Sequence, residues 1–574
     1  MEKGLLKRRY RNMKIQFCGA SNTVTGSCHL ITTDKHKILL DCGQFQGGKA
    51  QDALNYEEFP FDPAELDFMI LSHPHIDHCG RIPLLVKRGF KGNIYCTDAC
   101  ADLLEVMLKD SGYIHEKEAE WANKKNERNG RPMVEPLYTF NDAMDALKFV
   151  KPVLYDQLVE INEDIKICFN DAGHILGSAV TELWIAENIC ERNEEGDPIS
   201  CTEEKNVSKI VFSGDLGVMN RPILRDPTII KKADYVIMET TYGNRLHPEN
   251  AMDVKKLMDI IRETAARGGT TVIPAFAVGR TQELIYELNR VIDNDSEYRK
   301  DFENLKVYID SPMATTATEV FRRNAQVFDE ETKEYILKGD NPLDFKNLKF
   351  TRSSQESMML NANKEPKVII SASGMCEAGR IRHHLKHNLW DERNSIVFVG
   401  YQAEGSLGRL IVEGAQEVTL FGEKINVKAQ IHNLQGFSGH ADKNGLMTWL
   451  GGFQQPPKQI FLVHGEMDAK DDFAVSVKAE LGYDPIVVRG NSEYVLEKDE
   501  IVNIEQAMAE AVDDETVAKT KSNLADIERR LEDIVATAKL AVDEDIDPEK
   551  MARINNIVLE LEKATINLGA EIGQ

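Results

Sequence analysis

Six consecutive residues, His73 to His78, carry three histidines and one aspartate in the order His-Pro-His-Ile-Asp-His. Imidazole suits zinc and other late first-row divalent metals, and a carboxylate adds a hard, charged ligand. The apolar residues 68–71 predict a strand that leads into this stretch. His73 and His75 then point the same way, while Asp77 and His78 face a second point. Four such side chains in six positions predict a site for two adjacent metals rather than a histidine-rich surface loop.

Length and composition limit the classes of protein that remain. A chain of 574 residues is too long for one core, so we expect two or three domains. No run of 18 apolar residues occurs, and residues 1–12 lack the apolar segment of a secretory signal. We therefore expect a cytoplasmic protein without a membrane span. Ten scattered cysteines, none in a CxxC pair, predict reduced thiols. The net charge of −25 argues against a basic protein that coats nucleic acid, but it allows local binding of phosphate.

Two patterns of secondary structure divide the chain. Residues 13–44 and 159–185 predict mainly strands, and residues 187–207 predict the acidic tip of a hairpin without chemistry. From about residue 235 to residue 402, strands and helices alternate about four times, which is typical of a parallel, doubly wound domain. Ligands of such domains gather outside the carboxyl ends of the strands.

Two further segments are predicted to be helical. Residues 101–150 are polar, with Trp121 and Tyr138 as expected anchors in the core. In residues 501–574, two stretches with apolar residues three and four apart flank Asp547-Pro548, which predicts a helical hairpin. Its apolar stripes would dock on the same chain or on a second copy. We favour the second copy and expect a homodimer.

Isolated acidic residues and histidines end several other apolar strands. Taken singly, each is more often a capping group than a metal ligand. Together with the histidine cluster they form an ordered series along the chain: Asp41, His174, Asp215, His440 and His464.

This series resembles the motifs of the metallo-β-lactamase superfamily. Asp41, residues 73–78, His174 and Asp215 match its four motifs in order. The resemblance extends to the β-CASP branch, which hydrolyses nucleic acids, because three further motifs match at Glu239, His440 and His464. It implies an α/β fold in which an αββα sandwich receives an inserted doubly wound β-CASP domain, followed by a C-terminal helical extension. The expected domains are 13–243 and 431–500 for the sandwich, 244–430 for the insertion and 501–574 for the extension.

The resemblance also implies roles for these residues around two zinc ions, with manganese as the alternative metal. One zinc would take His73, His75 and His174. The other would take Asp77, His78 and His464. Asp215 would bridge both ions, and Asp41 would orient the site without binding a metal. Glu239 would position His440 as the proton donor, and both join Asp77 in the catalytic set.

The implied activity is hydrolysis of RNA phosphodiester bonds, because a histidine at the His464 position goes with RNA-acting members. Two metals activate a hydroxide and His440 protonates the leaving ribose oxygen, which leaves 5′-phosphate and 3′-hydroxyl ends. Residues 437–442 resemble those of endonucleolytic members, such as the cleavage subunit of the pre-mRNA 3′-end machinery. The alternatives are a 5′–3′ exoribonuclease of the ribonuclease J type, a thioester hydrolase and a pseudo-enzyme that binds RNA.

The RNA, expected to be single-stranded, needs donors for its phosphates. Glycine-containing loops offer backbone N–H groups, and arginine pairs with phosphate through two parallel hydrogen bonds. The candidates in the doubly wound segment are Arg280, Ser373, Gly374, Arg380, Gly405, Ser406 and Arg409.

Overall fold

The structure is a computed structural model that describes residues 13–192, 198–248, 250–402 and 405–496, with Ile527, Ile557, Val558 and Leu561 beyond them. Residues 1–500 form one compact unit and residues 501–574 a second. The four described residues of the second unit are helical and exposed. The rest of the predicted helical hairpin lies outside the described residues. None of the described helices is long and apolar enough to cross a membrane.

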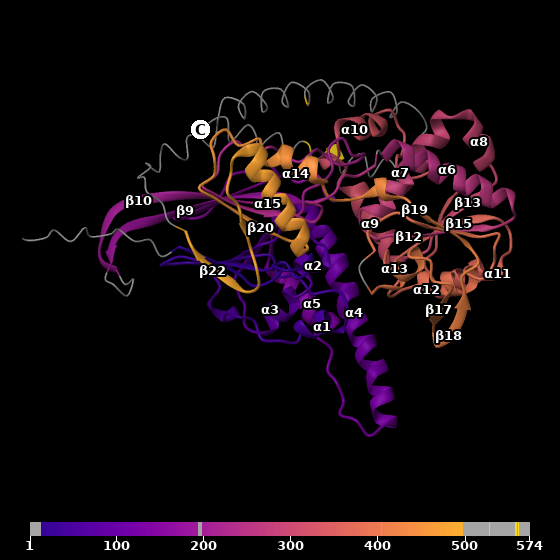
Figure 1. Ribbon diagram of the computed structural model, residues 1–574, viewed down its shortest axis with the longest axis horizontal. Coiled ribbons are helices and arrows are strands. Elements are labelled where there is room, and N and C mark those ends of the chain that lie inside the picture. Colours follow the sequence, from indigo (N-terminus) through magenta and orange to yellow (C-terminus); the bar gives the residue numbers. More distant parts are fainter. Residues whose placement is uncertain are drawn as a thin grey trace, which may run out of the picture. The chain divides into compact units, whose positions relative to one another are not determined.

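Two seven-stranded sheets pack face to face in the part of the chain that holds the histidine cluster (Figure 1). The first sheet has the order β22-β1-β2-β3-β4-β5-β6 and the second the order β21-β20-β11-β10-β9-β8-β7. Alternate residues point inward, so that Phe17 and Ile38 from the first sheet meet Phe169 and Ile237 from the second in one core.

The strands of the first sheet are β1 (Lys14–Phe17), β2 (His29–Thr32), β3 (Lys37–Leu40), β4 (Phe68–Ile70), β5 (Asn93–Thr97), β6 (Val150–Val153) and β22 (Ser492–Val495). Those of the second are β7 (Val159–Asn162), β8 (Ile165–Asp171), β9 (Ala179–Arg192), β10 (Pro198–Phe212), β11 (Tyr235–Glu239), β20 (Gln459–Val463) and β21 (Ile486–Val487). The predicted hairpin around residues 187–207 is formed by the antiparallel pair β9 and β10.

Helices cover the outer face of each sheet. Apolar side chains of α2 (Ile76–Cys79), α3 (Ile82–Lys87), α5 (Phe140–Ala146) and the first half of α4 (Asp98–Arg128) pack on the first sheet. Those of α14 (Lys443–Leu450) and α15 (Met467–Leu481) pack on the second. The remaining short elements of this part are α1 (Lys49–Leu54), η1 (Pro63–Glu65), η2 (Leu147–Phe149) and η4 (Gln435–Phe437). The predicted αββα sandwich is confirmed.

A six-stranded parallel sheet of order β14-β13-β15-β12-β16-β19 lies between the two parts of the sandwich in sequence. Its central strands β12, β15 and β16 are buried on both faces. Ile273 joins the core under α6, α7 and α9, whereas its neighbour Val272 joins the core under α12 and α13. The predicted doubly wound insertion is therefore confirmed.

The strands of the insertion are β12 (Thr270–Pro274), β13 (Lys306–Ile309), β14 (Leu348–Phe350), β15 (Lys367–Ser371), β16 (Ser395–Phe398) and β19 (Gln430–Asn433), with the hairpin β17 (Glu417–Leu420) and β18 (Glu423–Asn426). Its helices are α6 (Asn250–Ala266), α7 (Arg280–Asn294), α8 (Ser296–Phe302), α9 (Pro312–Arg323), η3 (Ala325–Val327), α10 (Glu330–Leu337), α11 (Ser354–Ala362), α12 (Ile381–Asn388) and α13 (Leu407–Val412).

The helix α4 is 31 residues long and extends well past the sandwich that its first half covers (Figure 1). Thr97 caps its start by accepting the N–H of Cys100. Tyr138, on the segment that returns from the helix, is fully buried as predicted, 2.7 Å from the hydroxyl of Ser111. The prediction for Trp121 is wrong. This side chain lies beyond Ala119, the last buried residue of the helix, and is 75% exposed.

Candidate metal centre

The ligand-type side chains lie directly after strands that end at the same edge of the sandwich. In the first sheet β3 and β4 are parallel neighbours, and in the second β11 is the parallel neighbour of both β10 and β20. Carboxyl ends of parallel neighbours meet, so residues far apart in sequence converge. They are Asp41 after β3, His73 to His78 after β4, His174 after β8, Asp215 after β10, Glu239 at the end of β11 and His464 after β20.

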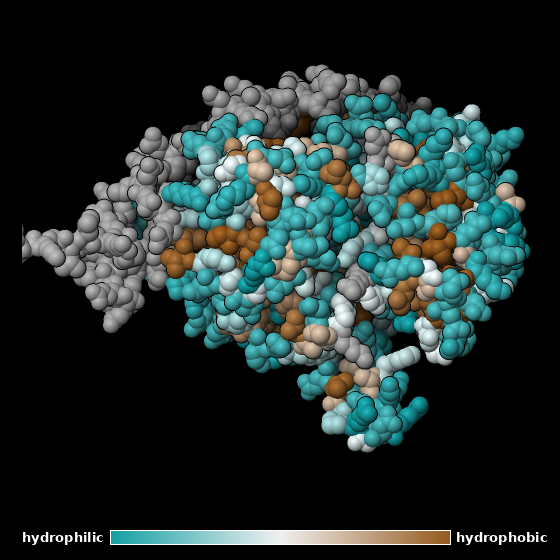
Figure 2. All heavy atoms as spheres, viewed as in Figure 1, coloured by the Kyte–Doolittle hydropathy of each residue, from teal (hydrophilic) through white to brown (hydrophobic). Residues whose placement is uncertain are grey.

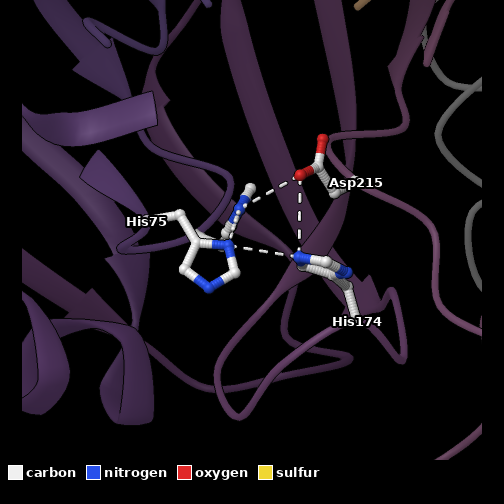
Figure 3. Close-up of side chains that lie close together, drawn as sticks. His75, His174 and Asp215 are labelled. Atoms are coloured by element: carbon white, nitrogen blue, oxygen red, sulfur yellow. Dashed lines mark hydrogen bonds and ion pairs between the residues drawn. The ribbon is translucent and has the colours of Figure 1, made fainter. Parts of the chain in front are cut away.

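The first group of potential ligands contains His73, His75, His174 and Asp215. Figure 3 shows His75, His174 and Asp215 turned towards one another. Nδ1 of His75 lies 3.1 Å from Nε2 of His73 and 3.2 Å from Nε2 of His174. Oδ2 of Asp215 lies 3.4 Å from Nε2 of His73 and 3.6 Å from Nε2 of His174. Three imidazoles and one carboxylate thus present one atom each to a common point.

The second group contains Asp77, His78 and His464. Nε2 of His464 lies 3.2 Å from Nε2 of His78 and 3.6 Å from Oδ2 of Asp77. The other oxygen of Asp215, Oδ1, lies 3.3 Å from Nε2 of His78 and 3.5 Å from Nδ1 of His464. Asp215 therefore directs one oxygen to each group.

These residues fit metal ions by distance and by charge. Zinc bound to nitrogen at about 2.0–2.1 Å with tetrahedral geometry separates its ligand atoms by about 3.3–3.4 Å. The separations in the first group, from 3.1 to 3.6 Å, bracket this value. In addition, Oδ1 of Asp215 is buried and has no hydrogen-bond partner in the described part of the chain. A buried carboxylate oxygen without a donor is costly unless a cation neutralises it.

Protonation states in the first group also suit metal binding. Burial lowers the pKa of His73, that of His174 and that of His75, the last to about 3, so these imidazoles keep their lone pairs. Burial favours the protonated acid of Asp215, but the imidazoles of His464 and His78 hold its pKa well below the usual range. Neutral imidazoles and an ionised carboxylate are the forms that ligate metals.

Asp41 contacts the ring nitrogen of His78 that points away from the second group. Its Oδ2 lies 2.6 Å from Nδ1 of His78, which leaves Nε2 of that ring facing the second group. The same carboxylate accepts the N–H of Ser72 at 2.9 Å and the hydroxyl of Ser27 at 3.0 Å. Burial opposes a proton on His78, but Asp215 and Asp41 together raise its pKa well above the ordinary value. A divalent cation at Nε2 would compete with that proton.

Two residues of the site have left-handed backbone conformations although they are not glycine. The φ angle is 57° at Asp41 and 48° at His464. This region is sparsely populated by residues with a Cβ atom and persists only where the surroundings enforce it. The N–H of His464 donates to the carbonyl of Ala20 at 2.7 Å, and that of Asp41 to the carbonyl of Ile70 at 2.9 Å. These bonds hold both turns, and the turns aim both side chains at the site.

His440 and Glu239 form a pair at the rim of the site. Nδ1 of His440 lies 3.0 Å from Oε1 of Glu239, and Nε2 lies 3.9 Å from Oδ2 of Asp215. Glu239 is itself fixed by the backbone N–H groups of Leu216 and Thr241 at 2.7 and 3.1 Å. Burial opposes protonation of His440, but Glu239 and Asp215 raise its pKa to about 9. These two residues also form a third potential ligand group with Asp215.

The sequence predicts seven phosphate-binding residues in the insertion. The arginines among them already have carboxylate partners. Arg280 is buried against Glu283, and Arg409 pairs with Glu413 at 2.6 Å. Arg380 donates to Asp310 at 2.6 Å.

The other four predicted residues lie in two turns of the insertion. In the turn after β15, Ser373 accepts the N–H of Glu377 at 3.2 Å, and Gly374 lies against the ring of Phe276. In the turn before α13, Gly405 has a φ of 80° and Ser406 caps the helix through the N–H of Arg409. Their role in substrate binding stays a prediction.

One buried cluster is not predictable from the sequence pattern. Arg221, on the loop after β10, and Arg280, on α7, share the carboxylate of Glu283. Both arginines are more than nine-tenths buried, and each retains one N–H group without a partner in the described chain. The guanidinium of Arg280 also lies 5.8 Å from the ring centre of Phe437, close to His440 in the sequence. The spacing of Arg280 and Glu283 on one helix was a signal for their pairing, but nothing local pointed to Arg221.

The sandwich and its histidine–aspartate groups define a metallo-hydrolase. Residues 22–138 match the model of the metallo-β-lactamase superfamily, and residues 281–411 that of the Beta-Casp domain. Residues 424–488 match a Zn-dependent metallo-hydrolase RNA specificity domain. Ribonuclease TTHA0252 of Thermus thermophilus is 36% identical to this chain over 454 residues, which cover 79% of this chain and 93% of that protein.

Two transcription termination factors named FttA are also similar. That of Methanocaldococcus jannaschii is 31% identical over 476 residues, which cover 81% of this chain and 69% of that factor. That of Methanosarcina mazei is 32% identical over 486 residues, which cover 82% and 69%. The chain belongs to the β-CASP ribonucleases of the metallo-β-lactamase superfamily and carries a metal cofactor. The family expected from the sequence motifs is confirmed.

Proposed function

We propose that this chain cuts single-stranded RNA at internal phosphodiester bonds with two zinc ions, manganese being the alternative metal. The observation that carries this proposal is the orientation of Asp215, whose two oxygens face two separate groups of nitrogen ligands. His73, His75 and His174 would hold one ion, and Asp77, His78 and His464 the other. When bound, two such ions lower the pKa of a water molecule towards about 7 and neutralise phosphoryl oxygens.

The residues around the metals supply the remaining steps. His440 turns Nε2 towards the ligand groups while Glu239 accepts from Nδ1, which fixes one tautomer and supports the protonated ring. A proton held at Nε2 serves the leaving ribose oxygen, since an alkoxide is a poor leaving group. The scissile bond then breaks between phosphorus and the 3′ oxygen, so that the products carry a 5′-phosphate and a 3′-hydroxyl.

A circular RNA of about 40 nucleotides tests the endonucleolytic mode, because it has no free end. We expect the full-length chain loaded with zinc to linearise it, and the His440→Ala variant to leave it intact. Cleavage of linear RNA only, dependent on a 5′-phosphate, would instead identify a 5′–3′ exoribonuclease. Turnover of a thioester without turnover of either RNA would identify a small-molecule hydrolase. Metal analysis of the same preparations distinguishes two ions per chain from one.

The expected domain boundaries remain part of this proposal. They are supported by the strands that build each sheet, since β1–β11 and β20–β22 make the sandwich and β12–β19 make the insertion. One boundary differs, because β19 (Gln430–Asn433) pairs with β16 and carries the insertion to residue 433, past the expected end at residue 430. A cytoplasmic location is supported by the eight cysteines whose side chains are described, which are all buried and are not bridged to one another. A homodimer through residues 501–574 rests on the sequence pattern alone.

A further inference from the structure

The distal half of α4 and the segment that returns from it form an arm that projects from the sandwich (Figures 1 and 2). Residues 121–134 make up its tip. The tip exposes large apolar side chains, because Trp121 is 75%, Met133 65% and Val134 45% exposed. Exposed apolar side chains at the end of a projection do nothing for the core, so a binding partner is the physical reason to place them there.

The charge of the tip is opposite to that of the chain. Residues 121–134 contain four basic and one acidic side chain, a net charge of +3, whereas the whole chain has −25. All four cations are exposed, and within the described residues none of them forms an ion pair. Apart from Glu127 in the tip, the acidic residues of the same helix, among them Glu116, Glu118 and Glu120, precede the tip and lie nearer the body. The four cations are Lys124, Lys125, Arg128 and Arg131.

Hydrogen bonds give the tip a defined shape. Asn123 donates to the carbonyl of Val134 at 2.9 Å and accepts its N–H at 2.8 Å. One turn further along the helix, Asn126 donates to the carbonyl of Pro132 at 2.9 Å. These bonds tie the returning segment to the helix. The backbone that carries the aromatic and basic side chains is therefore held in one conformation, which lowers the entropic cost of binding a partner.

We propose that the tip of this arm is a second contact site for single-stranded RNA, outside the active site. An exposed indole offers a face for base stacking, and the cations around it offer charge to phosphates. A charged polymer with flat, apolar rings is the partner that matches both properties at once. The inference rests on the proposed ribonuclease function and assigns the arm to the grip on that substrate.

The length of the helix predicts which RNAs reach the tip. The start of α4 lies beside the loop that carries His174, since the hydroxyl of Thr97 donates to the carbonyl of Gly177 at 2.7 Å. From there Trp121 is about 35 Å along the helix at about 1.5 Å per residue. A stacked strand advances about 3.4 Å per nucleotide, so about ten nucleotides separate the cleavage site from the tip. Short RNAs occupy the active site without touching the arm.

The test compares an 8-nucleotide and a 30-nucleotide single-stranded RNA as substrates of the zinc-loaded, full-length chain. We expect Trp121→Ala to lower kcat/KM about tenfold on the longer RNA and less than twofold on the shorter one. Trp121→Phe should recover most of this loss, since a phenyl ring still stacks. Replacing all four tip cations by serine should also flatten the salt dependence of KM, by about 0.7 in logarithmic slope for each lost phosphate contact.

Matched controls carry the same changes elsewhere. Trp390→Ala removes another exposed tryptophan, and a fourfold serine variant on the insertion removes the same charge, at Lys300, Lys346, Lys349 and Lys364. If the tip variants have the same kcat/KM on the longer RNA as these controls, the inference is overturned and a protein becomes the expected partner of the tip. If the unchanged chain cleaves neither RNA, the proposed function fails instead, so the two failures are distinguishable.

Discussion

Replacing Glu239 by glutamine tests whether this residue acts through His440. Oε1 of Glu239 accepts the N–H of Leu216 and faces Nδ1 of His440, while Oε2 accepts the N–H of Thr241. Glutamine has the same shape but only one acceptor oxygen. Whichever way the amide is turned, its NH₂ group opposes a backbone N–H, and the arrangement that keeps His440 bonded turns the NH₂ towards Thr241.

The magnitude follows from these contacts. A hydrogen bond to a charged group contributes about 1.5–3 kcal/mol, and the substitution replaces the carboxylate that supports a protonated His440. If this free energy is lost in the transition state of proton transfer from Nε2, kcat falls about 10- to 100-fold, at about 1.4 kcal/mol for each factor of ten. Removing the ring itself with His440→Ala costs the full contribution of a general acid, about 10²- to 10⁴-fold.

The assay is a double-mutant cycle on single-turnover RNA cleavage, with metal content measured by mass spectrometry for every variant. If Glu239 acts only through His440, the double variant cleaves no more slowly than His440→Ala alone. If the rate losses of the two single variants multiply in the double variant, this reasoning is refuted and Glu239 has a role that does not depend on His440. Loss of metal in either single variant would refute it differently, since Asp215, Glu239 and His440 also form a potential ligand group.

Three further predictions concern metal binding, stability and assembly. Asp215→Ala should release metal and abolish cleavage together, and stoichiometric metal in that variant would contradict a bridging role. Glu283→Ala leaves two buried arginines without their carboxylate and should destabilise the fold by about 3–5 kcal/mol in thermal or urea unfolding. The control Glu319→Ala removes an exposed pair with Arg352 and should cost less than about 1 kcal/mol. Deleting residues 501–574 should convert a dimer into a monomer in light scattering, and an unchanged number of copies would exclude self-association through them.

The order of the ligand-type residues made the family and fold predictable. Asp41, His174 and Asp215 end strands, and parallel strands deliver their carboxyl ends to one edge, so their convergence follows from chain order. The φ angles at Asp41 and His464 were beyond such reasoning, because tertiary hydrogen bonds impose them against the preference of both residue types.

Partners far apart in sequence were beyond the predictions for individual side chains. Arg380 donates to Asp310, 70 residues earlier in the chain, and the same carboxylate lies 2.5 Å from the ring of His384. The role of Arg380 in phosphate binding stays a prediction. The environment of Trp121 was misjudged for a different reason. A tryptophan is buried by default, and only the direction of α4 takes it away from the core.

The pairing of β20 with β11 has a consequence for the chain as it leaves the ribosome. All four members of the first ligand group have been synthesised by Asp215, whereas the second group waits for His464, which follows β20 some 250 residues later. Until then β11 is an open edge, exposed while the whole insertion is made. The two ligand groups are therefore completed in the order of translation. A nascent chain stopped before residue 459 contains the whole first ligand group, but its strand β11 has no partner on one side.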